Sequence, residues 1–116
     1  MSSKRKMATI AVRAALESDK QHGAIVPPLY LSSNFAFAGY DDKPEYDYTR
    51  SGNPTRNALA DALKDLEGGA GAIVTSSGMA AITLVMQLLK PEDLLIAPHD
   101  CYGGTYRLFE SLSAKG

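Results

Sequence analysis

The chain has 116 residues, of which 45% are hydrophobic and 22% charged, a size and composition typical of one small globular domain. Twelve basic and thirteen acidic residues give a formal net charge of −1, and this balance argues against nucleic acid or anionic lipid as a partner. The apolar stretches are far shorter than the roughly 20 residues of a membrane span. The basic N-terminus lacks the sustained apolar region of a secretory signal, so we expect a cytoplasmic protein.

Cysteine and histidine usage gives little sign of a disulfide or a metal. The single cysteine, Cys101, cannot form an internal disulfide, which agrees with a reducing compartment. His22 and His99 lie far apart and have no ligand spacing around them, so we predict no metal site.

Residues 1–53 read as an extended N-terminal arm. They contain three prolines and many turn formers, and helical periodicity is limited to a modest stretch from Thr9 to Leu16. From Pro54 onward the apolar pattern becomes regular. The change predicts a boundary between this arm, which we expect to make oligomer contacts, and the start of an α/β domain over residues 54–116.

The first regular segment has the signals of a helix at both ends. Asn53 is a good N-cap, and Pro54 suits the first helical position because no intrahelical partner exists there for its missing N–H. Gly68 and Gly69 supply the stop. Three leucines recur at helical spacing on one face: Leu59, Leu63 and Leu66.

The rest of the chain alternates between strand and helix patterns. Short apolar runs over 72–75 and 94–97 predict buried strands. Residues 76–90 predict a serine-capped helix, with Pro91 just beyond its end, and 104–114 predict a final helix. This order is typical of a doubly wound α/β sheet. Two such strands alone cannot cover both of their faces, so the sequence predicts the opening of a larger α/β domain.

The turn "TSSGMAA" lies where the first predicted strand meets a helix N-terminus, a position at which α/β proteins bind ligands. Backbone N–H groups of Gly78 and Met79, with the hydroxyls of Ser76 and Ser77, are suited to a phosphate. In the alternative interpretation a serine only caps the helix and Gly78 only permits tight packing. The nearby glycines from 68 to 71 precede the strand and therefore do not form a dinucleotide-binding motif.

The segment "HDCYGGTYR" repeats this arrangement after the second predicted strand. Tyr102 is placed to offer the face of its ring to a ligand at the same sheet edge, although a single Tyr more commonly packs under a loop. Arg107, just inside the last predicted helix, is either within reach of a carboxylate or solvated.

Tyr48 and Arg50 precede the first regular helix. If their segment is extended, side chains two residues apart point to the same side and converge on one target. The planar fork of Arg suits a phosphate. The alternative is a solvated pair, and we expect Arg56, inside the helix, to lie on the surface.

Three motifs, "YTRSGNPTRNALADALKDLEGG", "TSSGMAAI" and "PHDCYGGTYRLF", together resemble the cysteine and methionine metabolism family of pyridoxal-phosphate enzymes. The resemblance runs from about Thr9 to the last residue. It implies the N-terminal part of the large domain of the aspartate-aminotransferase type (fold type I), a mostly parallel sheet flanked by helices. It also implies a homotetramer built from two tight dimers.

The resemblance implies a role for each candidate site residue. Gly78 and Met79, together with Ser77, would bind the phosphate of pyridoxal 5'-phosphate. Tyr48 and Arg50 would reach the phosphate of the neighbouring subunit's cofactor.

The implied reaction is a γ-replacement. With the cofactor as electron sink, an O-succinyl- or O-acetylhomoserine loses its α-proton, its β-proton and then its γ-acyloxy group as a carboxylate, and cysteine adds at the γ-carbon. The product is cystathionine, in the transsulfuration route of methionine biosynthesis. Tyr102 would stack on the cofactor ring and assist proton transfer near the leaving group, and Arg107 would face the substrate.

The resemblance also implies that a part is missing. Family members are several times longer, and the lysine that binds the cofactor lies beyond Gly116. None of the following lysines has its sequence context: Lys43, Lys64, Lys90 and Lys115. We therefore expect a truncated chain that is inactive alone.

Three alternatives to this function stay open. Ser51 stands where some bacterial γ-replacement enzymes carry a second basic residue, so cystathionine γ-lyase and O-acylhomoserine sulfhydrylase activities remain candidates. A hypothesis of another class is a non-catalytic fragment that acts only through subunit association.

Overall fold

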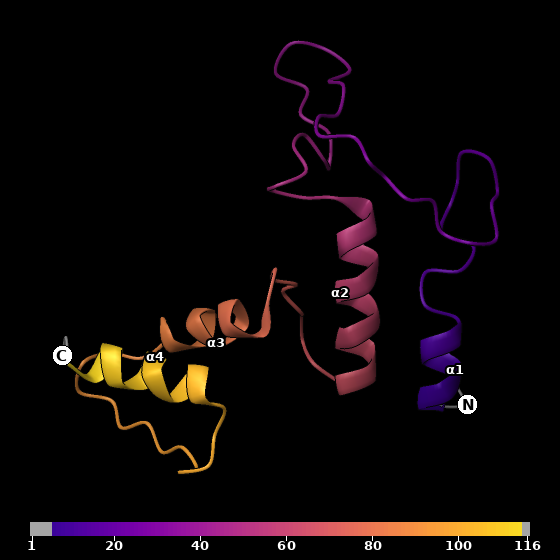
Figure 1. The fold of residues 1–116 in the computed structure, drawn as a ribbon. Coiled ribbons are helices and arrows are strands. Elements are labelled where there is room, and N and C mark those ends of the chain that lie inside the picture. Colours follow the sequence, from indigo (N-terminus) through magenta and orange to yellow (C-terminus); the bar gives the residue numbers. More distant parts are fainter. Residues whose placement is uncertain (1–5, 115–116) are drawn as a thin grey trace. The chain divides into compact units, whose positions relative to one another are not determined.

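The computed structural model of the protein describes residues 6–114, so that Lys115 lies outside the described residues. This part of the chain contains α1 (Met7–Val12), α2 (Pro54–Glu67), α3 (Gly78–Met86) and α4 (Gly103–Ser113) (Figure 1). The elements fall into two compact units, one ending at Val74 and the other beginning at Thr75. None of these helices is long and apolar enough to span a membrane. The predicted boundary between arm and domain at residue 53 stays a prediction.

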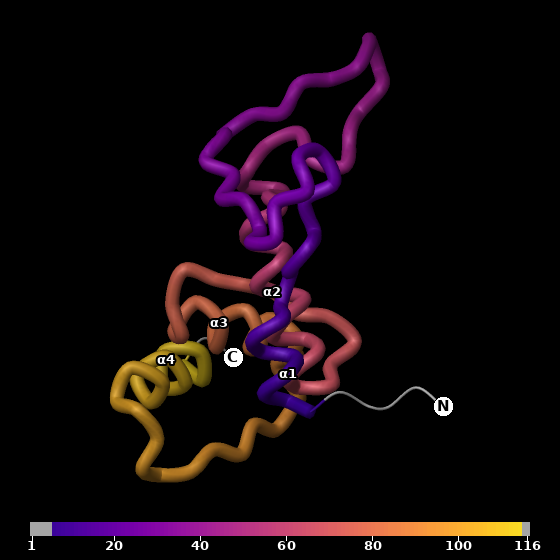
Figure 2. The backbone as a smooth tube through the Cα atoms, turned by 90° about the vertical axis from the view of Figure 1, so that its right-hand side faces the viewer, coloured from indigo at the N-terminus to yellow at the C-terminus, as the bar shows by residue number. Residues whose placement is uncertain are grey.

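In the first unit, α1 packs beside α2 (Figures 1 and 2). The modest helical periodicity noted from Thr9 to Leu16 corresponds only in part to α1, which begins earlier, at Met7, and ends at Val12. It cannot continue as a right-handed helix because Ala15 and Glu17 have left-handed backbone conformations, with φ of 54° and 61°.

The predicted bounds of α2 are confirmed at both ends. The Asn53 side chain accepts a hydrogen bond from the Thr55 N–H at 2.9 Å, and Pro54 occupies the first helical position. At the other end Gly68 adopts φ of 66°, and the N–H of Gly69 donates to the carbonyl of Lys64 at 2.9 Å. These are local interactions, which is why the sequence alone identifies them.

The arm between α1 and α2 is irregular, as expected, and runs as open loops in Figure 2. Two segments within it, residues 33–35 and residues 47–49, pair with each other. The Phe35 N–H donates to the Asp47 carbonyl at 2.9 Å and the Thr49 N–H to the Ser33 carbonyl at 2.8 Å, on either side of a bridge between Asn34 and Tyr48. This pairing attaches the segment that carries Tyr48 to the preceding part of the arm.

In the second unit, α3 packs beside α4. Helix α4 begins and ends within one residue of its predicted bounds, whereas α3 ends at Met86, before the predicted helical pattern does. Residues 87–89 continue it only as tight turns, in which each N–H bonds to the carbonyl three residues earlier. Thr105 is the buried residue of α4, with 8% of its surface exposed.

The two predicted strands are not formed. Residues 72–75 and 94–97 are unpaired, and Ile73 and Ile96 in them are 77% and 85% exposed. A buried strand requires a neighbouring strand and cover on both faces, and residues 6–114 offer neither to these segments. No hydrophobic side chain among the described residues is buried. Of the predicted α/β arrangement, the helices are therefore present in the described residues and the sheet is not.

Candidate functional site

The N-terminus of α3 offers two free backbone donors. The Ser77 side chain accepts a hydrogen bond from the Ala80 N–H at 3.1 Å, and its carbonyl accepts one from the Ala81 N–H at 3.1 Å. No acceptor within the described residues lies on the N–H groups of Gly78 and Met79. Both belong to the first turn of the helix, where the helix dipole is positive, so this turn is suited to an anion such as a phosphate.

Ser77 and Gly78 bear on the two interpretations of this turn. Ser77 is a helix cap, as the simpler interpretation proposed, but its hydroxyl accepts the capping bond and keeps its proton to donate elsewhere. Gly78 does not serve tight packing, because a Cβ at this position would meet no atom within 4 Å. The space in front of α3 is therefore open, and a cofactor phosphate fits these residues.

Tyr102 lies next to this turn. A Cβ on Gly104 would stand 2.6 Å from the Tyr102 ring and 3.2 Å from the sulfur of Met79, so Gly104 lies between the two side chains. The Thr105 hydroxyl contacts the same sulfur at 3.8 Å. Tyr102 is 73% exposed and is not packed under a loop. The structure thus brings Tyr102 to the start of α3, and its role there stays a prediction.

Arg107 belongs to the same end of α4. A Cβ on Gly103 would lie 3.6 Å from the Arg107 guanidinium, so this side chain folds back along the first turn of the helix. Within residues 6–114 it forms no ion pair with a carboxylate. This exposed guanidinium, which pairs with no carboxylate of the described residues, lies at the start of α4 and is available to bind a carboxylate ligand.

The expected extended geometry of Tyr48 and Arg50 is wrong, although the two side chains do lie together. The N–H groups of Ser51 and Gly52 both donate to the Tyr48 carbonyl at 3.0 Å, which makes the segment a turn. Within this turn the guanidinium carbon of Arg50 lies 5.0 Å from the centroid of the Tyr48 ring, a cation–π arrangement. The pair is therefore held by stacking and not by alternation along a strand.

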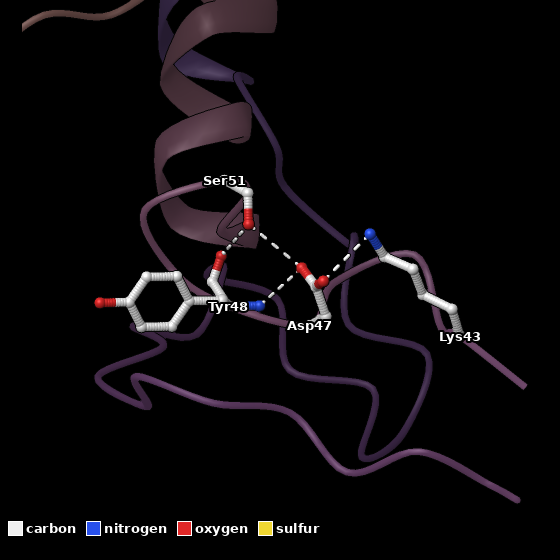
Figure 3. A network of polar contacts seen from close by, with 4 residues as sticks. All are labelled: Lys43, Asp47, Tyr48 and Ser51. Carbon is white, nitrogen blue, oxygen red and sulfur yellow. Dashed lines mark hydrogen bonds and ion pairs between the residues drawn. The ribbon is translucent and has the colours of Figure 1, made fainter. Parts of the chain in front are cut away.

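A polar network fixes the backbone of this turn (Figure 3). Asp47 accepts hydrogen bonds from the Tyr48 N–H at 2.8 Å and the Ser51 hydroxyl at 3.1 Å, and pairs with the Lys43 ammonium at 3.0 Å. The bond from Lys43 lowers the pKa of the Asp47 carboxyl below its ordinary value. The Tyr48 hydroxyl points away from this network.

Arg56, expected on the surface, is a residue that sequence reasoning missed. Its guanidinium donates to the carbonyl of Thr49 at 2.8 Å and to the carbonyl of Arg50 at 3.3 Å. The sequence feature that could have predicted these bonds is an Arg in the first turn of a capped helix, because that turn lies next to the residues just before the cap.

Asn53 does more than cap α2. It is only 6% exposed, and its amide donates to the Tyr30 carbonyl at 3.1 Å and to the Thr49 hydroxyl at 2.7 Å. The Tyr30 N–H in turn donates to the Thr55 hydroxyl at 2.9 Å. The start of α2 thus holds both the arm and the Tyr48–Arg50 turn.

Other chemistry-bearing residues do not gather into a site. No group of three or more His, Cys, Asp and Glu residues suited to a metal ion occurs in the part of the chain that the structure describes. Lys43 pairs with Asp47, and Lys64 pairs with Asp61 and Asp65 at 3.0 and 3.6 Å. The hydrogen bond to Asp61 raises the pKa of the Lys64 ammonium above its ordinary value, which favours the charged form over the neutral amine that attaches to a carbonyl.

Comparison with known proteins identifies the family. The model of the Cys/Met metabolism PLP-dependent enzyme family matches residues 8–116. The chain belongs to this family. Cystathionine gamma-synthase of Escherichia coli (strain K12) is 58% identical over 113 residues, which cover 97% of this chain and 29% of that protein. The Bacillus subtilis (strain 168) member, cystathionine gamma-synthase/O-acetylhomoserine (thiol)-lyase, is 47% identical over 81% of this chain and 25% of its own length.

Solved structures of the family agree with the fold of this segment. Cystathionine gamma synthase from Xanthomonas oryzae pv. oryzae, solved with aminoacrylate and cysteine and also with cystathionine, matches with a TM-score of 0.90 and 56% identity. The match covers 97% of this chain and 29% of that one. The chain thus spans less than a third of the length of these relatives, and its fold is like the corresponding segment of this PLP-dependent family member.

Proposed function

We propose that the chain is the N-terminal part of a cystathionine γ-synthase. This enzyme replaces the acyloxy group of O-succinylhomoserine or O-acetylhomoserine, which leaves as succinate or acetate, by the sulfur of cysteine and forms cystathionine for methionine biosynthesis. The observation that carries the proposal is the 58% identity to the E. coli synthase over 97% of the chain. A cytoplasmic location and a mostly parallel sheet completed by other parts of the enzyme belong to the same proposal.

The cofactor of this enzyme is pyridoxal 5'-phosphate, which when bound supplies an electron sink for proton loss from the α-carbon of the amino-acid substrate. The free N–H groups of Gly78 and Met79, with the Ser77 hydroxyl, hold its phosphate at the start of α3. Tyr48 and Arg50 of a neighbouring subunit add a hydroxyl and a guanidinium to the same phosphate, in a homotetramer built as a dimer of dimers. The lysine that attaches the cofactor comes from outside residues 1–116.

The residues of α4 act on the ring and the substrate. Tyr102 stacks on the cofactor ring, for which its exposed face next to Met79 is suited, and its hydroxyl relays a proton near the leaving group. Arg107 binds the substrate carboxylate by a charge-assisted pair of hydrogen bonds. Because a guanidinium stays charged at all physiological pH values, this contact needs no proton to be moved.

A second candidate is an O-acylhomoserine sulfhydrylase, which uses sulfide in place of cysteine. The B. subtilis relative, named as both a cystathionine gamma-synthase and an O-acetylhomoserine (thiol)-lyase, favours this second activity.

The test uses a chimaera in which this chain replaces the matching 113-residue segment of the E. coli relative. Its rates are measured with O-succinylhomoserine plus cysteine, with O-acetylhomoserine plus sulfide, and with cystathionine alone, beside those of the unmodified E. coli enzyme. We expect cystathionine formation to dominate in both proteins. A chimaera that binds pyridoxal phosphate but mainly cleaves cystathionine or mainly uses sulfide would refute the synthase assignment.

A further inference from the structure

The side chain of Arg56 reaches from the first turn of α2 to the backbone around Arg50. One guanidinium nitrogen donates to the Thr49 carbonyl at 2.8 Å and the other to the Arg50 carbonyl at 3.3 Å. These two carbonyls belong to the peptide groups on either side of the Arg50 Cα. Because both peptide planes are held by one rigid planar group, the backbone conformation of Arg50 is held as well.

The other contacts of the turn act on its neighbours. Asn53 bonds to the Thr49 hydroxyl, and Ser51 bonds to Asp47 and to the Tyr48 carbonyl. A Cβ on Gly52 would lie 3.2 Å from the Tyr46 ring, so that ring closes the far side of the turn. Among the described residues, the group that donates a hydrogen bond to the Arg50 carbonyl is the Arg56 guanidinium.

The side chain of Arg50 receives its own support from Tyr48. Its guanidinium lies over the Tyr48 ring at 5.0 Å, and both side chains are on the exposed side of the turn. A guanidinium supported by a ring and attached to a fixed backbone has lost much of its freedom before a ligand arrives. Binding an anion with it therefore costs less conformational entropy.

We propose that Arg56 is a positioning residue for the cofactor phosphate: it fixes the backbone of Arg50 so that the Tyr48–Arg50 pair is preorganised to bind the phosphate in the neighbouring subunit. This inference rests on the proposed function, in which that pair binds the phosphate. Arg56 does not itself contact the cofactor, because its fork is engaged by the two carbonyls.

The test is the affinity of the cofactor-free chimaera for pyridoxal phosphate, measured by absorbance titration in two backgrounds. With Arg50 present, Arg56→Ala weakens the affinity roughly tenfold, the loss expected when a charge-assisted contact is no longer preorganised. In an Arg50→Ala background the same change has less than about a twofold effect, because the group that it positions is gone. With saturating cofactor, kcat returns to near that of the parent.

Two further variants guard against effects on folding. Arg56→Lys keeps the charge but lacks the planar fork, so it assembles and still loses most of the affinity. Arg13→Ala removes another arginine of the same unit, which pairs with Glu17 at 3.6 Å, and leaves the affinity unchanged. If Arg56→Ala does not assemble, the cofactor affinity of Arg56→Lys, measured with and without Arg50, decides the test.

The outcomes separate this inference from the proposed function. If Arg50→Ala leaves the cofactor affinity unchanged, the phosphate role of Arg50 is refuted, and the positioning role with it. If Arg50→Ala weakens binding and the Arg56 variants do not, only the positioning role is refuted. An equal loss from Arg56→Ala in both backgrounds assigns Arg56 a general structural role and also refutes the inference.

Discussion

Gly104 separates Tyr102 from Met79, and a single methyl group there tests whether the position of the Tyr102 ring matters. In Gly104→Ala the new Cβ stands 2.6 Å from the ring, so the ring must retreat by about 0.8 Å to reach an ordinary contact of 3.4 Å. Met79, whose sulfur would be 3.2 Å away, must give by a few tenths of an ångström. Both shifts occur at the start of α3, where we propose that the cofactor phosphate binds.

The expected effects on stability and on function differ. Overpacking costs about 1–3 kcal/mol in a rigid core, but Tyr102 is 73% exposed, so its ring can rotate away. Replacing a helical Gly by Ala offsets part of that cost by up to about 1 kcal/mol. We therefore expect the free energy of unfolding to change by no more than about 1 kcal/mol, whereas a misplacement near 1 Å lowers turnover roughly 10- to 100-fold.

The adjacent glycine provides the control. A Cβ on Gly103 would meet the Arg107 guanidinium at 3.6 Å, an ordinary contact, so Gly103→Ala makes the same chemical change without displacing the ring. Turnover and pyridoxal-phosphate affinity are measured for both variants in the chimaera, and again with Tyr102→Ala added. Equal behaviour of the two alanine variants would refute the reasoning. So would a Gly104→Ala effect that persists undiminished without the Tyr102 ring.

Four further predictions follow from the same contacts. Gly78→Ala adds a methyl group to open space at the start of α3. We expect unchanged thermal stability and roughly tenfold weaker binding of the cofactor through its phosphate. An undiminished cofactor affinity in titration would contradict this prediction. Asn53→Ala removes the cap of α2 and the hydrogen bonds to Tyr30 and Thr49. We expect the free energy of unfolding, measured with denaturant, to fall by about 2 kcal/mol. A decrease of less than about 0.5 kcal/mol would contradict the role of these contacts. Lys43 lowers the pKa of the Asp47 carboxyl below 3.8, so the stability that this pair contributes is fully present above pH 3.8 and is lost only as pH falls through the lower folded pKa. An NMR titration of the Asp47 carboxyl with a midpoint above 3.8 would contradict this direction. Tyr102→Phe keeps the ring and removes the hydroxyl, so we expect lower kcat with nearly unchanged cofactor affinity, and full turnover would exclude the proton-relay role.

The parts of the fold that the sequence predicts are those fixed by neighbouring residues. Asn53, Pro54 and Gly68 define α2 because a cap, a proline and a left-handed glycine act within one turn of the helix. The start of α3 after its N-cap Ser77 was predictable for the same reason. The strands at 72–75 and 94–97 were not, because an apolar run becomes a strand only when another strand pairs with it.

The candidate site shows the same division. The donors of Gly78 and Met79 could be predicted, since they follow from the position of a helix start. The contact between Gly104, Tyr102 and Met79 depends on how two helices pack, and no local pattern encodes it. Tyr48 and Arg50 lie together as predicted, but through a turn and a stacked pair. The bonds from Arg56 become visible only once that turn has its shape.

The central claim is that this chain contributes to a γ-synthase site assembled from two subunits, and a subunit-mixing experiment tests it most directly. Chimaera subunits carrying Tyr48→Phe and Arg50→Ala are refolded with subunits carrying Gly78→Ala, and cystathionine formation from O-succinylhomoserine and cysteine is measured at limiting pyridoxal phosphate. If the Tyr48–Arg50 pair serves the neighbouring site, about a quarter of the sites in an equal mixture regain both intact parts. Activity then rises above that of either parent variant. Activity that stays at the average of the two parents would contradict the account.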